Sequence, residues 1–309
     1  MHFPISGATI NPVILVGLGF IVGILGGFFG VGGSFLAGPA LFALGMPMNY
    51  VVGTDLTHIV GKSIVAARRH WLLGSVDLRL AGIMVVGTVL GTQAGVEGIE
   101  ALKKIGRVDQ VVGIFAIVVY TCISIFIAFE SWQSLKIAPE KQRHIAGASP
   151  AADKDKLFFA RFAKWVQRLP LGPRVSLPFS GVQSISIGAI LLVSFVGGAF
   201  SSFLGGGAGY IRMPSMVYLL GIPTHIAVGT DLFEIVVSAS VGSFEHAVDG
   251  NVDILVALIM QTGAAVGAQI GATLTQYFSG PRIRFAFAPL PLIGAGLIVY
   301  GLLTGHHVK

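Results

Sequence analysis

Apolar residues along this chain gather into ten segments that are separated by short polar stretches. The segments lie approximately at 12–28, 34–45, 50–66, 78–96, 110–129, 183–203, 208–220, 226–243, 252–273 and 284–304. An α-helix needs roughly 20 apolar residues to cross a bilayer, and most segments approach that length. The second segment of each half has only about 12 residues, so it either crosses poorly or forms half of a broken helix pair. The pattern predicts an all-α, polytopic membrane protein.

The ten segments form two copies of one unit, with about five helical segments in each copy. A glycine cluster follows the first segment of both copies, at 26–33 and 197–207, and the copies are offset by about 175 residues. The sequence Val-Gly-Thr-Asp-Leu occurs at 52–56 and again at 228–232, and Gly-x-Gln-x-Gly occurs at 91–95 and at 267–271. Two glycine-broken apolar units in one chain are typical of a secondary transporter.

Charge between the segments indicates the topology. Residues 130–180 carry nine Lys and Arg against four Asp and Glu, which places this stretch in the cytoplasm by the positive-inside rule. Five crossings per half make the two repeats inverted; four crossings plus a re-entrant hairpin make them parallel. We therefore divide the chain into a first transmembrane repeat (1–130), a cytoplasmic linker (131–182) and a second transmembrane repeat (183–309). Within the linker, 153–169 predicts an amphipathic helix that lies on the inner leaflet or packs under the protein itself.

Composition agrees with this class and excludes others. The chain is 54% hydrophobic and 11% charged, with a mean hydropathy of +0.83, whereas soluble domains carry about 25% charged residues. The net charge of +6 does not indicate nucleic acid, because the basic residues lie in loops. The single cysteine, Cys122, excludes a disulfide framework. Because no zinc spacing, Walker loop or nucleophile elbow occurs, we expect no enzyme activity, catalytic residue, metal or cofactor.

The glycine clusters are the first candidate site. A helix that begins after such a cluster presents unpaired N–H groups and the positive end of its dipole, and small hydroxyls beside them complete an anion site. The alternative is close helix packing through small residues. The residues proposed to bind substrate here are Gly30, Gly32, Gly33 and Ser34 in the first copy and Ser202, Gly205, Gly206 and Gly207 in the second.

Ionisable residues inside the third segments are the second candidate site. Charged groups within a membrane span are costly and usually functional. The copies differ at these positions: a histidine in the first copy corresponds to a glutamate in the second, and a lysine corresponds to a serine. One half could therefore hold an anion while the other handles a proton. Thr-Asp in either copy could instead cap a helix. The proposed residues are Thr54, Asp55, His58 and Lys62, and Thr230, Asp231 and Glu234.

Three further polar residues lie in apolar surroundings. Arg212, near the start of a short segment, either neutralises an anion or extends to the membrane interface. Gln93 and Gln269, in the two Gly-x-Gln-x-Gly patterns, bind substrate or form hydrogen bonds between helices. An anion in a low-dielectric cavity needs a positive partner, for which Lys62, Arg212 and His58 are the candidates. An unperturbed histidine titrates near pH ~6.5, so we expect His58 to sense pH.

Together, the duplicated glycine-rich helices, the Val-Gly-Thr-Asp motif and the Gly-x-Gln-x-Gly helix resemble the TauE/SafE (TSUP) family of sulfite and organosulfonate exporters. The resemblance covers nearly all of the membrane part. It implies multi-pass transport, in a bacterial-type inner membrane, of small sulfur-containing anions such as sulfite or sulfonates.

We therefore expect a secondary transporter working by alternating access around an anion site near the midplane. Its expected partners are a small anionic substrate, the lipid bilayer and, in a coupled mechanism, a proton or other ion, with no nucleic acid. A channel-like anion pore is the main alternative, and a non-transporting assembly factor the weaker one. The sequence leaves the substrate, direction, coupling ion and oligomeric state open.

Overall fold

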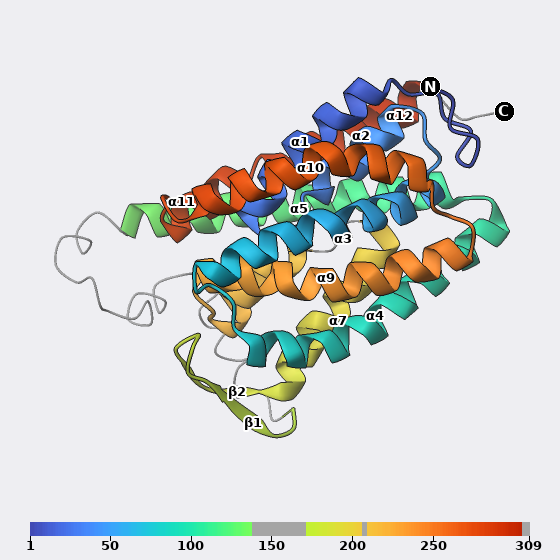
Figure 1. Ribbon diagram of the computed structural model, residues 1–309. Helices are drawn as coiled ribbons and strands as arrows, with labels where there is room; N and C mark the ends of the chain where they lie inside the picture. The colour runs from blue at the N-terminus through green and yellow to red at the C-terminus, as the bar shows by residue number, and fades with distance from the viewer. Residues whose placement is uncertain (138–170, 206–208, 305–309) are drawn as a thin grey trace.

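The computed structural model describes residues 1–137, 171–205 and 209–304 of the chain. Each of the ten predicted segments is helical there, which confirms the all-α fold (Figure 1). The first half consists of α1 (Pro12–Phe29), α2 (Ser34–Ala43), α3 (Met48–Leu72), α4 (Leu78–Ile105) and α5 (Val108–Ile137). The second half consists of β1 (Arg174–Leu177), β2 (Val182–Ser186), α7 (Ile187–Leu204), α8 (Gly209–Ser215), the π-helical turn η4 (Met216–Leu220), α9 (Thr224–Val248), α10 (Ile254–Thr275), α11 (Gly280–Phe287) and α12 (Leu290–Thr304).

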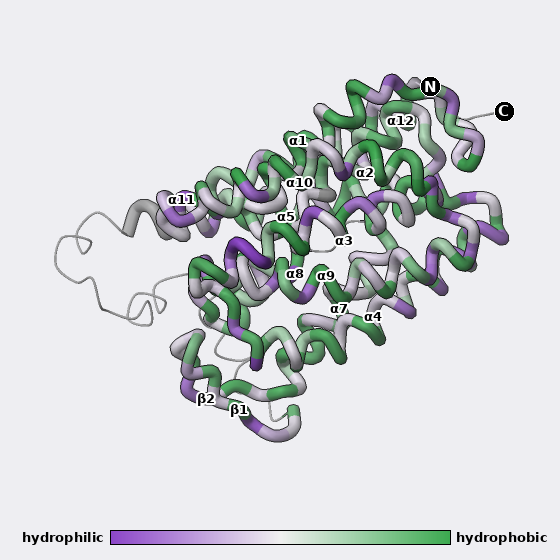
Figure 2. The backbone as a smooth tube through the Cα atoms, in the orientation of Figure 1, coloured by the Kyte–Doolittle hydropathy of each residue, from purple (hydrophilic) through white to green (hydrophobic). Residues whose placement is uncertain are grey.

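The helices are suited to a membrane. Among the described residues, seven helical stretches are long and apolar enough to cross one. Figure 2 shows hydrophobic residues along the helices and hydrophilic residues mainly toward the two ends of the bundle. α3 is 25 residues long but is not among the seven; it carries Asp55, Lys62 and a basic C-terminal turn. The protein is therefore a multi-pass membrane protein.

Each half packs its first helix against the fourth helix of the other half. α1 lies along α10, and α7 lies along α4, while α3 and α9 pack together in the middle. Glycines allow both close approaches: a Cβ on Gly23 of α1 would overlap the backbone of Ala264, and one on Gly198 of α7 would overlap that of Thr88. Reciprocal contacts of this kind tie the two repeats into one body.

The two repeats are inverted with respect to each other. In Figure 1, the N-terminus and the end of α12 lie at one end of the bundle, whereas α5 ends and β1 begins at the other. The first half therefore starts and finishes on opposite sides, which is the arrangement expected from an odd number of passes. The parallel alternative does not agree with this placement. The glycine breaks give short second helices, since α2 has 10 residues and α8 has 7.

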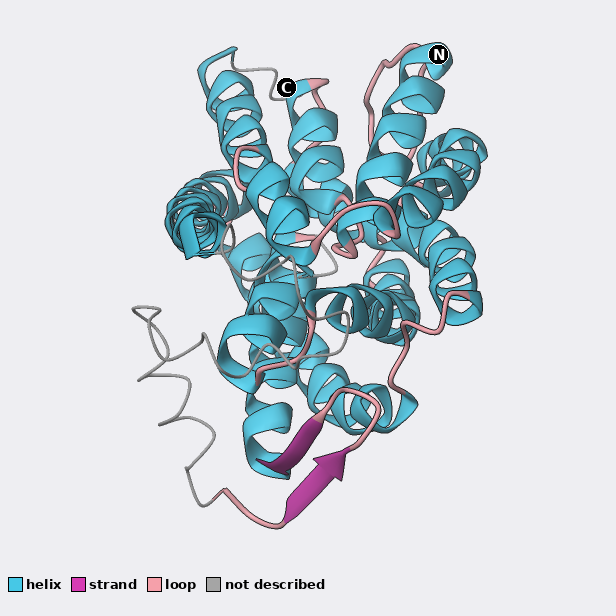
Figure 3. Ribbon diagram, turned by 90° about the vertical axis from the view of Figure 1, so that its left-hand side faces the viewer, coloured by secondary structure: helices cyan, strands magenta, loops and turns pink. Residues whose placement is uncertain are grey.

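A short hairpin begins each repeat, which the sequence reasoning missed. β1 and β2 pair antiparallel, and they are the only named strands in the described ranges (Figure 3). The predicted helix at 183–203 thus starts later, at Ile187. At the N-terminus a bridge joins His2 to Thr9, with the turn at Gly7 (φ 71°), as the β1–β2 turn is at Gly181 (φ 70°).

These two hairpins hold equivalent helix ends in the opposite repeat. Ser6 Oγ donates to Asp253 Oδ2 at 2.8 Å, and Ser180 Oγ donates to Asp77 Oδ2 at 2.5 Å. Asp253 and Asp77 are the N-cap residues of α10 and α4. β1 lies in the stretch that the sequence division assigned to the linker, whereas most of β2 lies in the predicted second repeat. The amphipathic helix predicted at 153–169 lies outside the described residues.

Candidate functional site

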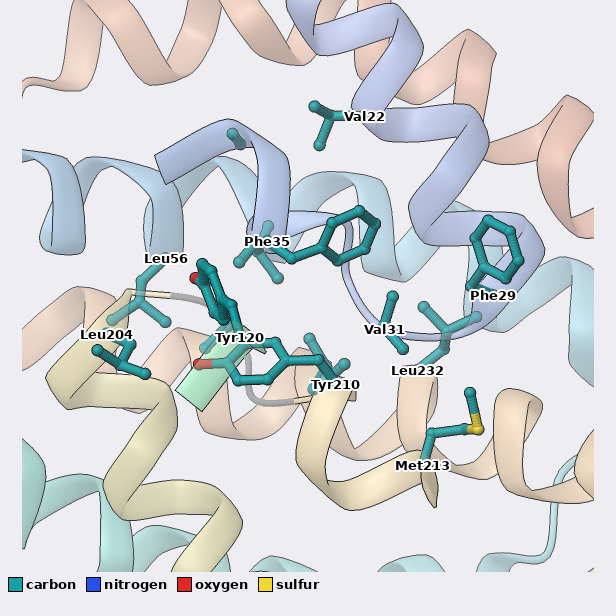
Figure 4. Close-up of a cluster of buried hydrophobic side chains, with 14 of the residues drawn as sticks. Val22, Phe29, Val31, Phe35, Leu56, Tyr120, Leu204, Tyr210, Met213 and Leu232 are labelled. Carbon is teal, nitrogen blue, oxygen red and sulfur yellow. The ribbon is translucent and has the colours of Figure 1, made fainter. Parts of the chain in front are cut away.

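The two glycine breaks meet in the centre of the bundle. Gly30 ends α1 with φ 72°, and Gly205 ends α7 with φ 75°, a left-handed conformation that favours glycine. A Cβ on Gly30 would lie 2.6 Å from Cα of Val228, and one on Gly205 would lie 2.6 Å from Cα of Val52, the equivalent residue of the other repeat. The first break therefore packs against α9 and the second against α3. Figure 4 shows Val31, in the first break, near Tyr210, which lies at the start of the helix after the second break.

The other predicted glycine-cluster residues have mixed outcomes. Gly32 and Gly33 have φ of 68° and 76°, and Gly33 is the N-cap of α2, so the predicted break is confirmed. Ser34 is the first residue of α2, and its side chain is not described. Ser202 is buried in the last turn of α7. Gly206 and Gly207 lie outside the described residues.

Three ionisable side chains form one row on α3, which we name the lysine cluster: Asp55, His58 and Lys62. Nδ1 of His58 lies 3.3 Å from Asp55 Oδ1 and 3.3 Å from Lys62 Nζ, and all three side chains are buried. One ring nitrogen thus faces an acceptor on one side and a donor on the other. It donates to Asp55 when protonated and accepts from Lys62 when unprotonated, so the protonation of the three groups is coupled.

A second set, the arginine cluster, joins α8 to α9 and consists of Arg212, Asp231 and Glu234. Arg212 Nε donates to Asp231 Oδ1 at 2.8 Å, and an Arg212 terminal nitrogen pairs with Glu234 Oε2. All three side chains are fully buried. Gly197 of α7 makes room for Arg212, because a Cβ there would collide with the arginine stem. The structure therefore brings together all three of these predicted residues, with the arginine already facing two carboxylates.

Two tyrosines stand between the clusters, and sequence reasoning did not single them out. Tyr120 of α5 and Tyr210 of α8 are buried with ring centroids 5.3 Å apart, edge to face (Figure 4). Both phenols interact electrostatically with Asp55, and Tyr210 also does so with Arg212. Polar groups thus run from one cluster to the other through the centre.

Gln261 of α10 is a further residue that the sequence did not reveal. With its amide oriented to satisfy both neighbours, it donates to the carbonyl of His58 at 2.8 Å and accepts from the amide of Lys62 at 3.1 Å. Gly61 lies beneath it, since a Cβ there would lie 2.5 Å from the glutamine side chain. Its signal in the sequence was one of a few polar residues in an apolar helix, which identifies no partner.

Thr54 and Thr230 have a structural contact instead of capping their own helices. Thr54 Oγ1 accepts the backbone N–H of Asp253, and Thr230 Oγ1 accepts that of Asp77, both at 2.9 Å. α3 begins at Met48, six residues before Thr54, so the capping alternative is wrong. These contacts fasten each third helix to the fourth helix of the other repeat.

Gln93 and Gln269 are not brought to the clusters. Both side chains are exposed on the outer faces of α4 and α10, while the glycines beside them face α7 and α1. His70 and His246 make equivalent contacts between helices: Nε2 of His70 lies 3.0 Å from the carbonyl of Gly27, and Nε2 of His246 lies 3.2 Å from that of Ser202.

Inverted repeats with broken helices around buried, mutually paired charges are typical of polytopic membrane transporters. Residues 15–298 match the family model described as sulfite exporter TauE/SafE. The chain therefore belongs to the TauE/SafE family of membrane transporters.

Several curated proteins are similar to the chain. The "Probable membrane transporter protein YunE" of Bacillus subtilis is 25% identical over 94% of this chain and 99% of its own length. The "Probable membrane transporter protein YjnA" of the same organism is 23% identical over 91% and 97%. The "Sulfite exporter TauE/SafE family protein 1" of Arabidopsis thaliana is 27% identical over 41% of this chain and 29% of its own length. No solved structure matches.

Proposed function

We propose that this protein is a secondary transporter of small sulfur-containing anions, such as sulfite or organosulfonates, in a bacterial-type inner membrane. The anion binds near the midplane, between the glycine breaks and the lysine cluster. Family membership supports transport, and the family description together with the names of the Arabidopsis relatives supports the choice of sulfur anions. The linker, and the loops on the same side of the membrane, face the cytoplasm, because their positive charge favours that side.

The observation that supports this binding site is that the two buried cations, Arg212 and Lys62, have different ionic partners. Arg212 faces two carboxylates, whereas Lys62 has His58 as its nearest ionisable contact and Asp55 one helical turn further on. An anion entering a low-dielectric centre needs a positive partner that is not already neutralised by contact. Lys62 fits this requirement best among the described residues.

The proposed mechanism is alternating access. Every charged side chain of both clusters is at most 2% exposed, so the centre is closed toward both sides. A closed centre between inverted repeats favours a carrier that exposes its site to one side at a time, rather than a continuous pore. Because the repeats contact each other through equivalent surfaces, rocking one against the other produces two related open states.

The test is uptake into proteoliposomes of sulfite, thiosulfate, sulfate, sulfoacetate and taurine. We expect saturable uptake of at least one sulfur anion, stimulated by the same unlabelled anion inside the vesicles. Lys62→Gln is expected to weaken binding tenfold or more, about 1.4 kcal/mol. The matched control is Lys103→Gln, which changes an exposed lysine near the end of α4.

Each outcome decides between functions. Non-saturable flux without stimulation by internal anion would indicate a channel. No flux of any of these anions would refute the proposed substrate class. Equal loss in the Lys62 and Lys103 variants would remove the lysine cluster from the site.

A further inference from the structure

We infer that the Asp231–Glu234 pair, held by Arg212, is the site at which this transporter carries its coupling proton. The inference rests on the proposed function and names its coupling ion and the position of that ion. Three fully buried groups from two neighbouring helices form this site, and the arrangement has no counterpart in the first repeat, where Glu234 is replaced by His58.

Counting charge gives the first argument. The arginine cluster has one cation and two carboxylates, a formal charge of −1, and none of the three side chains is exposed. An uncompensated charge in such surroundings is costly, and the ordinary response is that a carboxylate takes up a proton. Two carboxylates that share one arginine therefore hold about one proton between them.

A carboxylate oxygen without a partner gives the second argument. Within the described residues, Asp231 Oδ2 is buried and accepts no hydrogen bond. A buried carboxylate oxygen without a donor is unfavourable, and a protonated carboxyl removes that charge. Gly209 preserves space beside the Asp231 oxygen, because a Cβ there would lie 2.8 Å from Oδ2. The glycine backbone at the start of α8 thus packs close to this oxygen.

Few other groups compete for the proton. The titratable groups that act on the arginine cluster in the described part of the chain are Tyr210 on α8 and, through it, Tyr120 on α5 and Asp55 on α3. Among the described residues, the hydroxyls of Thr88 on α4 and of Ser238 on α9 itself form hydrogen bonds with Glu234, and neither hydroxyl titrates. The tyrosines are neutral near neutral pH, so they connect the two clusters without adding charge.

Substrate binding then couples to this proton. A monovalent anion beside Lys62 adds one negative charge to the same dry centre, and protonating the second carboxylate restores the balance while leaving Arg212 positive. Anion and proton therefore bind cooperatively, and each raises the affinity for the other by the same factor. The carrier moves the anion together with a proton.

The first measurement is proton uptake by the purified full-length protein in weakly buffered detergent solution. The added anion is methanesulfonate, because it is monovalent and does not titrate near neutral pH. We expect uptake of about one proton per bound monovalent anion in the parent, and close to none in the double variant Asp231→Asn/Glu234→Gln, which keeps side-chain size but has no carboxylate left to protonate. The matched control is Glu245→Gln, a half-buried carboxylate on the same helix α9.

The second measurement needs no substrate. A proton held in the folded protein and released on unfolding makes thermal stability fall as pH rises above the ordinary carboxyl range of about 4. We expect this slope in the parent and in Glu245→Gln, and a flatter profile in Glu234→Gln. Parent-like proton uptake in the double variant, or a parent-like stability slope in Glu234→Gln, would overturn the inference. If no anion binds to the parent, yet Glu234→Gln flattens the slope, the proposed function fails and the proton remains assigned to the pair.

Discussion

Replacing Gly30 by alanine should measure how tightly the two halves meet at the breaks. Gly30 follows α1 at φ 72°, where a side chain costs roughly 1–2 kcal/mol. The added Cβ would also lie 2.6 Å from Cα and Cγ1 of Val228 on α9. Overpacking of this kind costs about 1–3 kcal/mol. We expect Gly30→Ala to lower the free energy of unfolding by about 2–5 kcal/mol in all.

Gly106 provides the matched control. It follows α4 at φ 70°, and nothing lies within 4 Å of the Cβ that alanine would add. Gly106→Ala therefore carries the backbone cost alone, and the difference between the two variants isolates the packing contribution of about 1–3 kcal/mol. By the internal symmetry, Gly205→Ala should resemble Gly30→Ala, because its Cβ would meet Val52.

The assay is reversible unfolding in mixed micelles with increasing dodecyl sulfate, followed by circular dichroism. A packing contribution of 1.4 kcal/mol is a factor of 10 in the unfolding equilibrium, which this assay resolves. If Gly30→Ala and Gly106→Ala are equally destabilised, a Cβ at Gly30 has room beside α9. That result would refute the claim that the first break packs tightly against the other repeat.

Three other predictions concern contacts, topology and the outer faces. Thr54→Val should lower the free energy of unfolding by about 1–3 kcal/mol, because the backbone amide of Asp253 loses its hydrogen-bond acceptor. Thr262→Val, on an exposed face, should cost much less, and equal losses in chemical unfolding would contradict this prediction. In a cysteine-free background, single cysteines at Asp249 and Arg79 should be labelled from opposite sides of the membrane, Asp249 from outside intact cells; labelling of both from one side would refute the inverted topology. Gln269→Leu should leave the uptake rate and apparent affinity for the anion unchanged, and a substantial loss of either would place α10's outer face in the transport cycle.

Long-range apolar patterning made the helices and the repeat predictable. Runs of apolar residues leave few alternatives to helices in a membrane, and the glycine clusters mark the breaks because they recur at one offset. The hairpins were missed for the opposite reason. The N-terminal one spans about ten residues, and little more than Ser6 and Gly7 repeats in the second copy as Ser180 and Gly181.

The site was predictable in part. Asp55, His58 and Lys62 share a helix face by spacing alone, since residues three or four apart lie on the same side. The partners of Arg212 depend on how α8 packs on α9, which spacing does not determine. Gln93 was included because its pattern repeats, yet residues two apart on a helix point to nearly opposite sides. Because Gly91 faces α7, the outward direction of Gln93 follows from the same pattern.

Contacts between the repeats are symmetric, whereas the charges they enclose are not. Thr54 and Thr230 accept hydrogen bonds from equivalent amides at the same distance, which agrees with the proposed exchange between two related states. At the centre, however, His58 stands where the other repeat has Glu234, and the two cations come from different elements, α3 and α8. In the proposed mechanism, the symmetric framework lets the halves exchange roles in exposing the centre. The asymmetric charges would then give the anion and the proton separate binding places, so that each could remain bound while the access side changes.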